Sequence, residues 1–221
     1  MIADLFDIKR SKIQDKGVFA RQFVPKGTII YFDCGRCRPW TKEELAGLSK
    51  EELRFAFVHN SSTKYCDERL LYNNHSCDSN TLDIGDDVSI VVRDIKKGEE
   101  QTEDYRVYSM DDVRFKGGCK CGAPNCMKRK AHLLPPRKEL LGTWAKEIDD
   151  ALRSADKVGQ PLKRELLKVH PELRPLFGRD EKKRNRVIAS LGKARANGMG
   201  GLGDDLEKVY SLAGLTRKIQ F

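Results

Sequence analysis

The sequence contains no long apolar run. None of its 221 residues belongs to a stretch near the roughly 18 apolar residues that a membrane-spanning helix needs. The N-terminus, MIADLFDIKR, has acids where a signal peptide has a basic and then an apolar stretch. These absences predict a chain with no membrane span and no classical secretion signal, located in the cytosol or the nucleus.

Disulfides are not expected in those compartments, because thiols stay reduced there. The cysteines are therefore predicted to be metal ligands or buried thiols, and they stand at positions 34, 37, 66, 77, 119, 121 and 126. Internal repeats and low-complexity tracts are also absent. At this length the chain can form one ordinary domain and a smaller one, with a sizeable core.

The net charge of +9 is concentrated in the C-terminal part of the chain. Residues 1–130 hold 23 Lys and Arg against 21 Asp and Glu, whereas residues 131–221 hold 19 against 12. An excess of basic side chains favours acidic partners such as nucleic acid. The run RDEKKRNR (179–186) is interpreted either as a nuclear-localisation or nucleic-acid patch, or as a solvated helix face.

The first 130 residues are predicted to be mostly strand and loop. Short segments rich in β-branched and aromatic residues predict strands at 17–23, 27–34 and 88–95. One helix is expected over 41–58, with Thr41 as N-cap and Glu44 completing a capping box.

The pattern changes after Pro135 and Pro136. Apolar residues then recur at helical spacing, which predicts helices at 137–156, 161–169, 180–196 and 204–213. The chain is thus expected to have a mainly β N-terminal part and a helical C-terminal part, with a boundary near 131–136.

Three cysteines lie within eight residues in the segment CKCGAPNC (119–126). Their C-x-C-x4-C spacing suits one tetrahedral zinc ion, which thiolates bind at about 2.3 Å. The fourth ligand must come from elsewhere, and Cys77 is the best candidate. Cys34 and Cys37, in CGRC, are a rival source of ligands, although Cys34 ends a predicted strand and also suits a buried thiol. Cys66 is interpreted as a buried thiol only.

Cys77 belongs to a polar stretch, YNNHSCDSN (72–80), which is too poor in apolar side chains to be core. A nucleophile formed by Cys77 and His75 is one reading of it. This reading is disfavoured, because the pattern offers no acid to orient the histidine, and a zinc-bound thiolate would not be available to attack.

Four motifs follow one another in order: SKIQDKGVFARQFVPKG (11–27), NHSCDSN (74–80), GEEQTEDY (98–105) and CKCGAPNC (119–126). Together they resemble the SET-domain protein-lysine methyltransferases that carry a cysteine-rich post-SET segment. The resemblance covers about residues 5–130. It implies a mainly β SET-domain fold, made of small curved sheets with a pseudoknot, followed by an α-helical C-terminal region. The implied parts are a SET domain over 1–115, a post-SET zinc segment over 116–134 and a helical region over 135–221.

The family's reaction is the transfer of a methyl group from S-adenosylmethionine to a substrate lysine. Such catalysis consists mostly of positioning the amine in line with the methyl carbon. Tyr105 matches the family's catalytic tyrosine, whose hydroxyl orients the amine and the methyl group. The implied partner is a protein that carries the target lysine, histone-like or otherwise basic, with nucleic acid near the basic C-terminal region. We expect that region to pack against the SET domain and to form part of the substrate groove or a homodimer contact.

The resemblance places the S-adenosylmethionine site on two segments. The implied contacts are Tyr72, Asn74 and His75 in one segment, and Lys16, Gly17 and Val18 in the other. The family's first cofactor loop usually reads Gly-x-Gly, and Asp15 stands at its first position here. Because Asp adopts a left-handed backbone conformation at modest cost, the turn is expected to survive.

Zinc is implied to be structural in this family. The expected ligands are Cys77, Cys119, Cys121 and Cys126. In this arrangement Asn74 and His75 face the cofactor, Cys77 turns the other way, and the zinc staples a flap that closes the lysine channel.

Three positions depart from the family pattern. Asp15 replaces a glycine, Ser79 replaces a common proline, and Glu103 stands where many members carry an aromatic residue that influences the number of methyl groups added. These departures support an alternative function, a non-catalytic SET-like module, stabilised by zinc, that binds protein or chromatin.

Overall fold

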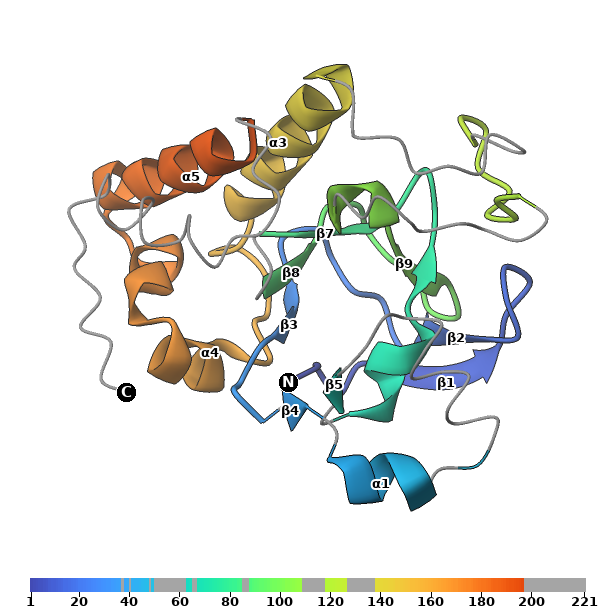
Figure 1. Ribbon diagram of the computed structural model, residues 1–221. Helices are drawn as coiled ribbons and strands as arrows, with labels where there is room; N and C mark the ends of the chain where they lie inside the picture. The colour runs from blue at the N-terminus through green and yellow to red at the C-terminus, as the bar shows by residue number, and fades with distance from the viewer. Residues whose placement is uncertain are drawn as a thin grey trace.

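The structure is a computed structural model that describes residues 1–36, 38–39, 41–47, 49, 63–64, 67–84, 88–108, 118–126 and 138–196. A curled sheet dominates its N-terminal part, and helices dominate its C-terminal part (Figure 1). The predicted mainly β fold followed by a helical region is therefore confirmed. Among the residues described, no helix is long and apolar enough to cross a membrane.

The sheet has seven strands in the order β1-β2-β9-β7-β8-β3, and β6 pairs with β9 beside this path. The strands are β1 (Phe6–Arg10), β2 (Lys16–Ala20), β3 (Ile29–Phe32), β6 (Asn74–His75), β7 (Thr81–Asp83), β8 (Val88–Val91) and β9 (Glu100–Glu103). A separate pair is formed by β4 (Arg38–Pro39) and β5 (Thr63–Lys64). Two 3₁₀ helices flank the site described below, η1 (Glu68–Tyr72) and η2 (Tyr105–Tyr108).

Strand β9 lies in the middle of this arrangement. It pairs antiparallel with β2 and parallel with both β6 and β7. The β6–β9 register places Asn74 opposite Thr102 and His75 opposite Glu103. Parallel neighbours need a long connection between them, so this pairing joins two segments that lie far apart in the sequence.

The predicted strands appear in shortened form as β2, β3 and β8. The predicted capping box is also present at the start of α1 (Lys42–Gly47). The Glu44 amide donates to Thr41 Oγ1 at 3.2 Å, and the Thr41 amide donates to a Glu44 carboxylate oxygen at 3.1 Å. The rest of the predicted 41–58 helix falls almost entirely outside the described residues.

The helical region contains α3 (Lys138–Leu152), α4 (Lys163–Val169), the 3₁₀ helix η3 (Pro171–Phe177) and α5 (Glu181–Ala196). Three of the predicted helices are thereby confirmed. The fourth, at 204–213, lies outside the described residues, and so do the expected boundary positions near 115 and 134.

Helix α3 shares one hydrophobic core with the sheet. Trp144, Ile148 and Leu152 on α3 are buried in the same cluster as Ile29 and Ile90 of the sheet. Each such side chain contributes roughly 1.5–3 kcal/mol when it is fully buried. The helical region therefore packs against the β domain, as expected.

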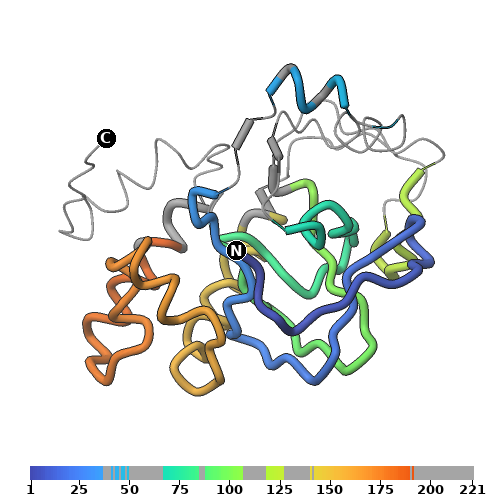
Figure 2. The backbone as a smooth tube through the Cα atoms, turned by 90° about the horizontal axis from the view of Figure 1, so that it is seen from below, coloured from blue at the N-terminus to red at the C-terminus, as the bar shows by residue number. Residues whose placement is uncertain are grey.

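Polar contacts fix this packing at the turn before β3. Gln160 donates to the Gly27 carbonyl at 2.8 Å and accepts from the Ile29 amide at 3.0 Å. Gly27 has a φ of 94°, and a Cβ there would lie 2.8 Å from the Ala151 carbonyl oxygen. In both overall views the helical region lies at one end of the sheet, and β1 and β2 lie at the other (Figures 1 and 2).

Candidate active site and metal centre

Tyr105 begins η2 directly after β9, next to β6. Its main-chain amide donates to His75 Nδ1 at 3.1 Å, and its hydroxyl donates to the Asn73 carbonyl. The Tyr105 and His75 rings lie 5.4 Å apart between centroids. Since the hydroxyl proton is directed at Asn73, the Tyr105 oxygen is left with lone pairs that can accept hydrogen bonds.

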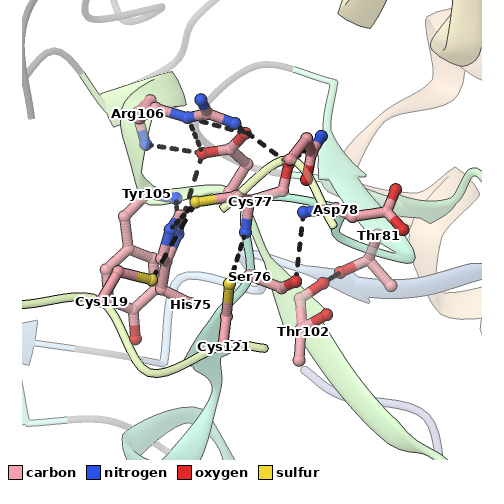
Figure 3. Close-up of polar contacts among 12 residues, drawn as sticks. His75, Ser76, Cys77, Asp78, Thr81, Thr102, Tyr105, Arg106, Cys119 and Cys121 are labelled. Atoms are coloured by element: carbon pink, nitrogen blue, oxygen red, sulfur yellow. Dashed lines mark hydrogen bonds and ion pairs between the residues drawn. The ribbon is translucent and has the colours of Figure 1, made fainter. Parts of the chain in front are cut away.

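His75 connects Tyr105 to the cysteines (Figure 3). Because Nδ1 accepts from the Tyr105 amide, the neutral ring carries its proton on Nε2, which lies 3.3 Å from Cys77 Sγ. Burial lowers the pKa of His75 to about 4, although the Asp104 carboxylate, 3.8 Å from Nδ1, opposes the shift. The ring is therefore neutral at pH 7, and its N–H points at the Cys77 sulfur.

This contact corrects one expectation. Cys77 was expected to turn away from the side that His75 faces, but the two side chains meet. Cys77 lies in the turn that follows β6, where its sulfur is 3.3 Å from His75 Nε2. A cysteine–histidine nucleophile is still not supported, because Cys77 is buried and lies among three other cysteines.

The four expected ligands form one cluster. The sulfur atoms of Cys77, Cys119, Cys121 and Cys126 all lie within 4.8 Å of one another, and those of Cys77 and Cys119 are 4.0 Å apart. Four thiolates at about 2.3 Å from a tetrahedral zinc would be about 3.8 Å apart. The cluster therefore fits zinc in both donor type and spacing.

Hydrogen bonds from main-chain amides favour the thiolate form of Cys121, which is the form that binds a metal ion. The Cys77 amide donates to Cys121 Sγ at 3.5 Å. Burial opposes ionisation of Cys121, but main-chain amides of Cys77 and Ala123 lower its pKa to about 7. Burial raises the pKa of Cys119, so an ion that binds here must displace that proton.

Of the two rival cysteines, the structure describes Cys34, which does not join this cluster. Cys34 accepts a hydrogen bond from Arg36 Nε at 3.2 Å, in a different part of the chain. Cys37 and Cys66 lie outside the described residues.

A buried ion pair supports the cluster from the helical side. Arg106 Nε donates to Asp104 at 2.8 Å, and Arg106 Nη2 donates to the Cys77 carbonyl at 3.1 Å. The same carbonyl accepts from Asn125 at 3.1 Å. Trp144 of α3 lies over the Arg106 guanidinium, 6.0 Å from ring centroid to Cζ. Sequence reasoning missed Arg106 and Trp144, because they lie far apart in the sequence and only the fold brings them together.

The expected cofactor loop forms the turn before β2. Asp15 has a φ of 35°, which confirms that it adopts the left-handed conformation that the turn requires. The Ser11 amide closes the turn by donating to the Asp15 carbonyl at 3.0 Å. An open hollow of about 430 Å³ lies here, lined by Ile8, Lys9, Arg10, Asp15 and Lys16.

Lys16 and Asn74 bring the two expected cofactor segments together. Lys16 Nζ donates to the Tyr72 hydroxyl at 3.3 Å and lies over the Tyr72 ring at 4.8 Å from its centroid. The Asn74 amide nitrogen donates to the Lys16 carbonyl at 2.8 Å. Val18, by contrast, is fully buried in the core and could reach a ligand only through its main chain.

Glu100 is a site residue that sequence reasoning missed. One carboxylate oxygen accepts from Asn74 at 2.7 Å, and the other accepts from the Ser11 hydroxyl at 2.9 Å. A Cβ on Gly17 would lie 2.0 Å from this carboxylate, so Gly17 is required here for space. In the sequence, Glu100 looks like one of two solvated acids in a turn, and its neighbours become visible only in the fold.

Glu103 points into the protein rather than into solvent. It is buried, and Ser89 donates to it at 3.4 Å as well as to Asp83. The departure from the aromatic family pattern is therefore accommodated by polar contacts with the neighbouring strands.

The structure is therefore a mainly β domain in which Tyr105 lies beside the β6–β9 pairing, and the four-cysteine cluster lies next to Tyr105 and His75. The family model of the SET domain matches residues 15–106. This match lies within residues 5–130, where the motifs predicted a SET domain.

Curated relatives match over part of this chain. Histone-lysine N-methyltransferase trr of Drosophila melanogaster is 28% identical over 138 residues, which cover 55% of this chain and 6% of that protein. Histone-lysine N-methyltransferase 2D of Homo sapiens is 30% identical over 138 residues, covering 55% of this chain and 2% of that protein. The chain thus spans only a small fraction of the length of these relatives.

The methyltransferase domain of human Histone-lysine N-methyltransferase SETMAR has a crystal structure that is similar over 58% of this chain and 57% of that chain. The sequence identity is 19% and the TM-score is 0.36. At this TM-score the likeness carries no weight for the function.

Proposed function

We propose that this chain is an S-adenosylmethionine-dependent protein-lysine N-methyltransferase that acts on histones or other basic, nucleic-acid-associated proteins. The observation that carries the proposal is the parallel β6–β9 pairing. It places Asn74 and His75 of one motif beside the strand that leads into Tyr105 of another. The names of the curated relatives, histone-lysine N-methyltransferases, support the same reaction.

The residues of the cofactor loop suit the amino-acid end of S-adenosylmethionine. The Lys16 ammonium suits a carboxylate, whereas the Lys16 carbonyl, Asn74 and Glu100 offer oxygen acceptors that suit an ammonium group. When bound, S-adenosylmethionine would supply the methyl group, and the substrate amine would lose a proton to solvent.

Tyr105 would orient the substrate amine. Its hydroxyl donates to the Asn73 carbonyl, so its oxygen presents lone pairs to an amine hydrogen and to the polarised methyl hydrogens. The bond from its amide to His75 fixes the main chain that carries the ring. Positioning of this kind supplies most of the rate enhancement in an in-line transfer.

Zinc would be held by Cys77, Cys119, Cys121 and Cys126, where it would supply a structural cross-link between the turn after β6 and the 118–126 segment. The main chain at Cys77 is then held by the cross-link, by Arg106 and by Asn125. This tethering would keep the segment next to Tyr105.

The net charge of +9 suits a basic substrate that is presented on nucleic acid, since phosphates attract the lysines and arginines of the enzyme. The exposed basic residues of α4 and α5 would contribute to this attraction. The helical region would then serve both as part of the core and as a surface near the nucleic acid.

The test is the transfer of labelled methyl groups from S-adenosylmethionine to core histones, nucleosomes and unrelated basic proteins, followed by mass spectrometry of the labelled residues. Tyr105→Phe should transfer little label, whereas the matched control Tyr31→Phe, a change of a tyrosine on β3, should transfer as much label as the wild type. Label on lysine supports the proposal. Tight cofactor binding with no label on any of these proteins would favour the non-catalytic binding module.

A further inference from the structure

We infer that Glu100 is a positioning residue, which fixes the Asn74 side-chain amide so that its oxygen faces the ammonium group of the cofactor. The inference rests on the proposed function and assigns a role to a residue that the sequence motifs left unassigned.

The neighbours of Asn74 determine which way its amide lies. The nitrogen Nδ2 is 2.8 Å from the Lys16 carbonyl oxygen and 2.7 Å from a Glu100 carboxylate oxygen. Both neighbours can only accept hydrogen bonds, and Nδ2 has two hydrogens to donate. If the amide flipped, its oxygen would face two other oxygens without a hydrogen between them. The amide oxygen of Asn74 is therefore held on the other side.

Glu100 can hold Asn74 because the cofactor loop holds Glu100. Its second carboxylate oxygen accepts from Ser11 Oγ at 2.9 Å, and Ser11 Oγ in turn accepts from the Ile13 amide at 2.9 Å. Gly17 leaves room for the carboxylate, because a Cβ there would lie only 2.0 Å away. Glu100 thus connects the 11–15 turn to β6 through direct hydrogen bonds.

The orientation of the Asn74 amide determines which chemical group the site can bind. The Asn74 amide oxygen, held on the side away from Glu100, is an acceptor, so the group that it receives must be a donor. An ammonium group satisfies this requirement, and the Lys16 side chain provides a cation for the adjacent carboxylate. The site should therefore select ligands that carry an amino-acid end over related nucleosides that lack it.

The experiment measures the binding of S-adenosylmethionine and of 5′-methylthioadenosine, which lacks the amino-acid end, by calorimetry. Glu100→Leu removes both acceptors, whereas Glu100→Gln keeps one of them. The matched control is Glu99→Gln, at a neighbouring acid that accepts from Arg93 and from the Lys96 amide instead.

Glu100→Leu is expected to weaken S-adenosylmethionine binding about tenfold or more, with 5′-methylthioadenosine binding unchanged. Glu100→Gln should retain most of the affinity, and Glu99→Gln should match the wild type. If Glu100→Leu does not fold, Ser11→Ala should show a smaller loss in the same direction.

Two results would overturn the inference. One is an equal loss of affinity for both ligands, which would mean that Glu100 only supports the fold. The other is undiminished S-adenosylmethionine binding by Glu100→Leu. If the wild type binds 5′-methylthioadenosine and S-adenosylmethionine equally, the inference fails while the proposed function stands; if it binds neither, both fail.

Discussion

The buried His75 ring should make the stability of this protein depend on pH in a defined window. Its pKa is about 4 in the folded protein, and burial is the main cause. In the unfolded chain the pKa of a histidine is about 6.5. The unfolded state therefore binds a proton at a higher pH than the folded state, and this difference favours unfolding as the pH falls.

The shift corresponds to about 3 kcal/mol, since each pKa unit is worth about 1.4 kcal/mol. The contribution of neutral His75 to folding is fully present above about pH 6.5. It declines as the pH falls from that value and is largely lost by about pH 4. At about pH 4.5 the loss should already be between about 2 and 3 kcal/mol.

Urea unfolding at several pH values measures this loss. The protein should be reduced and treated with a chelator, so that protonation of metal-bound thiolates does not contribute. His75→Gln has no titrating ring, whereas all carboxylates titrate in both proteins. The wild type should thus lose about 2–3 kcal/mol more than His75→Gln between about pH 7 and pH 4.5. Parallel stability profiles for the two proteins would refute the assignment of a buried, neutral His75.

Three further perturbations have defined outcomes. Gly17→Ala should displace the Glu100 carboxylate and weaken S-adenosylmethionine binding about tenfold with little change in the circular dichroism spectrum; unchanged binding would contradict the geometry. Trp144→Ala removes a large buried ring next to Arg106, so it should lower the free energy of unfolding in urea by roughly 3–5 kcal/mol. A loss below about 1 kcal/mol would mean that neighbouring side chains move in to fill the space left by the ring. Chelation of zinc should make the 118–126 segment sensitive to limited proteolysis, and equal cleavage with and without zinc would argue against the cross-link.

The fold could be predicted from the sequence where the buried side chains are apolar, and less well where the buried side chains are polar. The apolar runs predicted β3 and β8, and helical spacing predicted α3 to α5. Strand β9, with the sequence EQTE, carries no such pattern. Polar groups of its buried residues are satisfied by hydrogen bonds: the Gln101 side chain donates to Thr81 Oγ1 at 2.8 Å, and the Thr102 main-chain amide donates to Asn80 Oδ1 at 2.9 Å. A sequence pattern that relies on hydrophobicity cannot detect burial of this kind.

The candidate site was predictable to the extent that motifs specify it. The cysteine spacing and the NHSC motif led to a set of four sulfurs that the fold brings together. The link from Cys77 through His75 to Tyr105 was not predicted, because the family resemblance implied that Cys77 turns away from the side that His75 faces. Glu100 was overlooked as well, because its partners Ser11 and Asn74 lie far away in the sequence.

The most direct test of the proposed activity compares the wild type with Tyr105→Phe at saturating S-adenosylmethionine and a histone substrate. Since the hydroxyl acts in the transfer and not in cofactor binding, kcat should fall about a hundredfold or more, with cofactor affinity within about twofold of the wild type. Lysine methylation by Tyr105→Phe at the wild-type rate would contradict the proposed mechanism. It would mean that the Tyr105 hydroxyl, although it lies beside the β6–β9 pairing, does not act in the transfer.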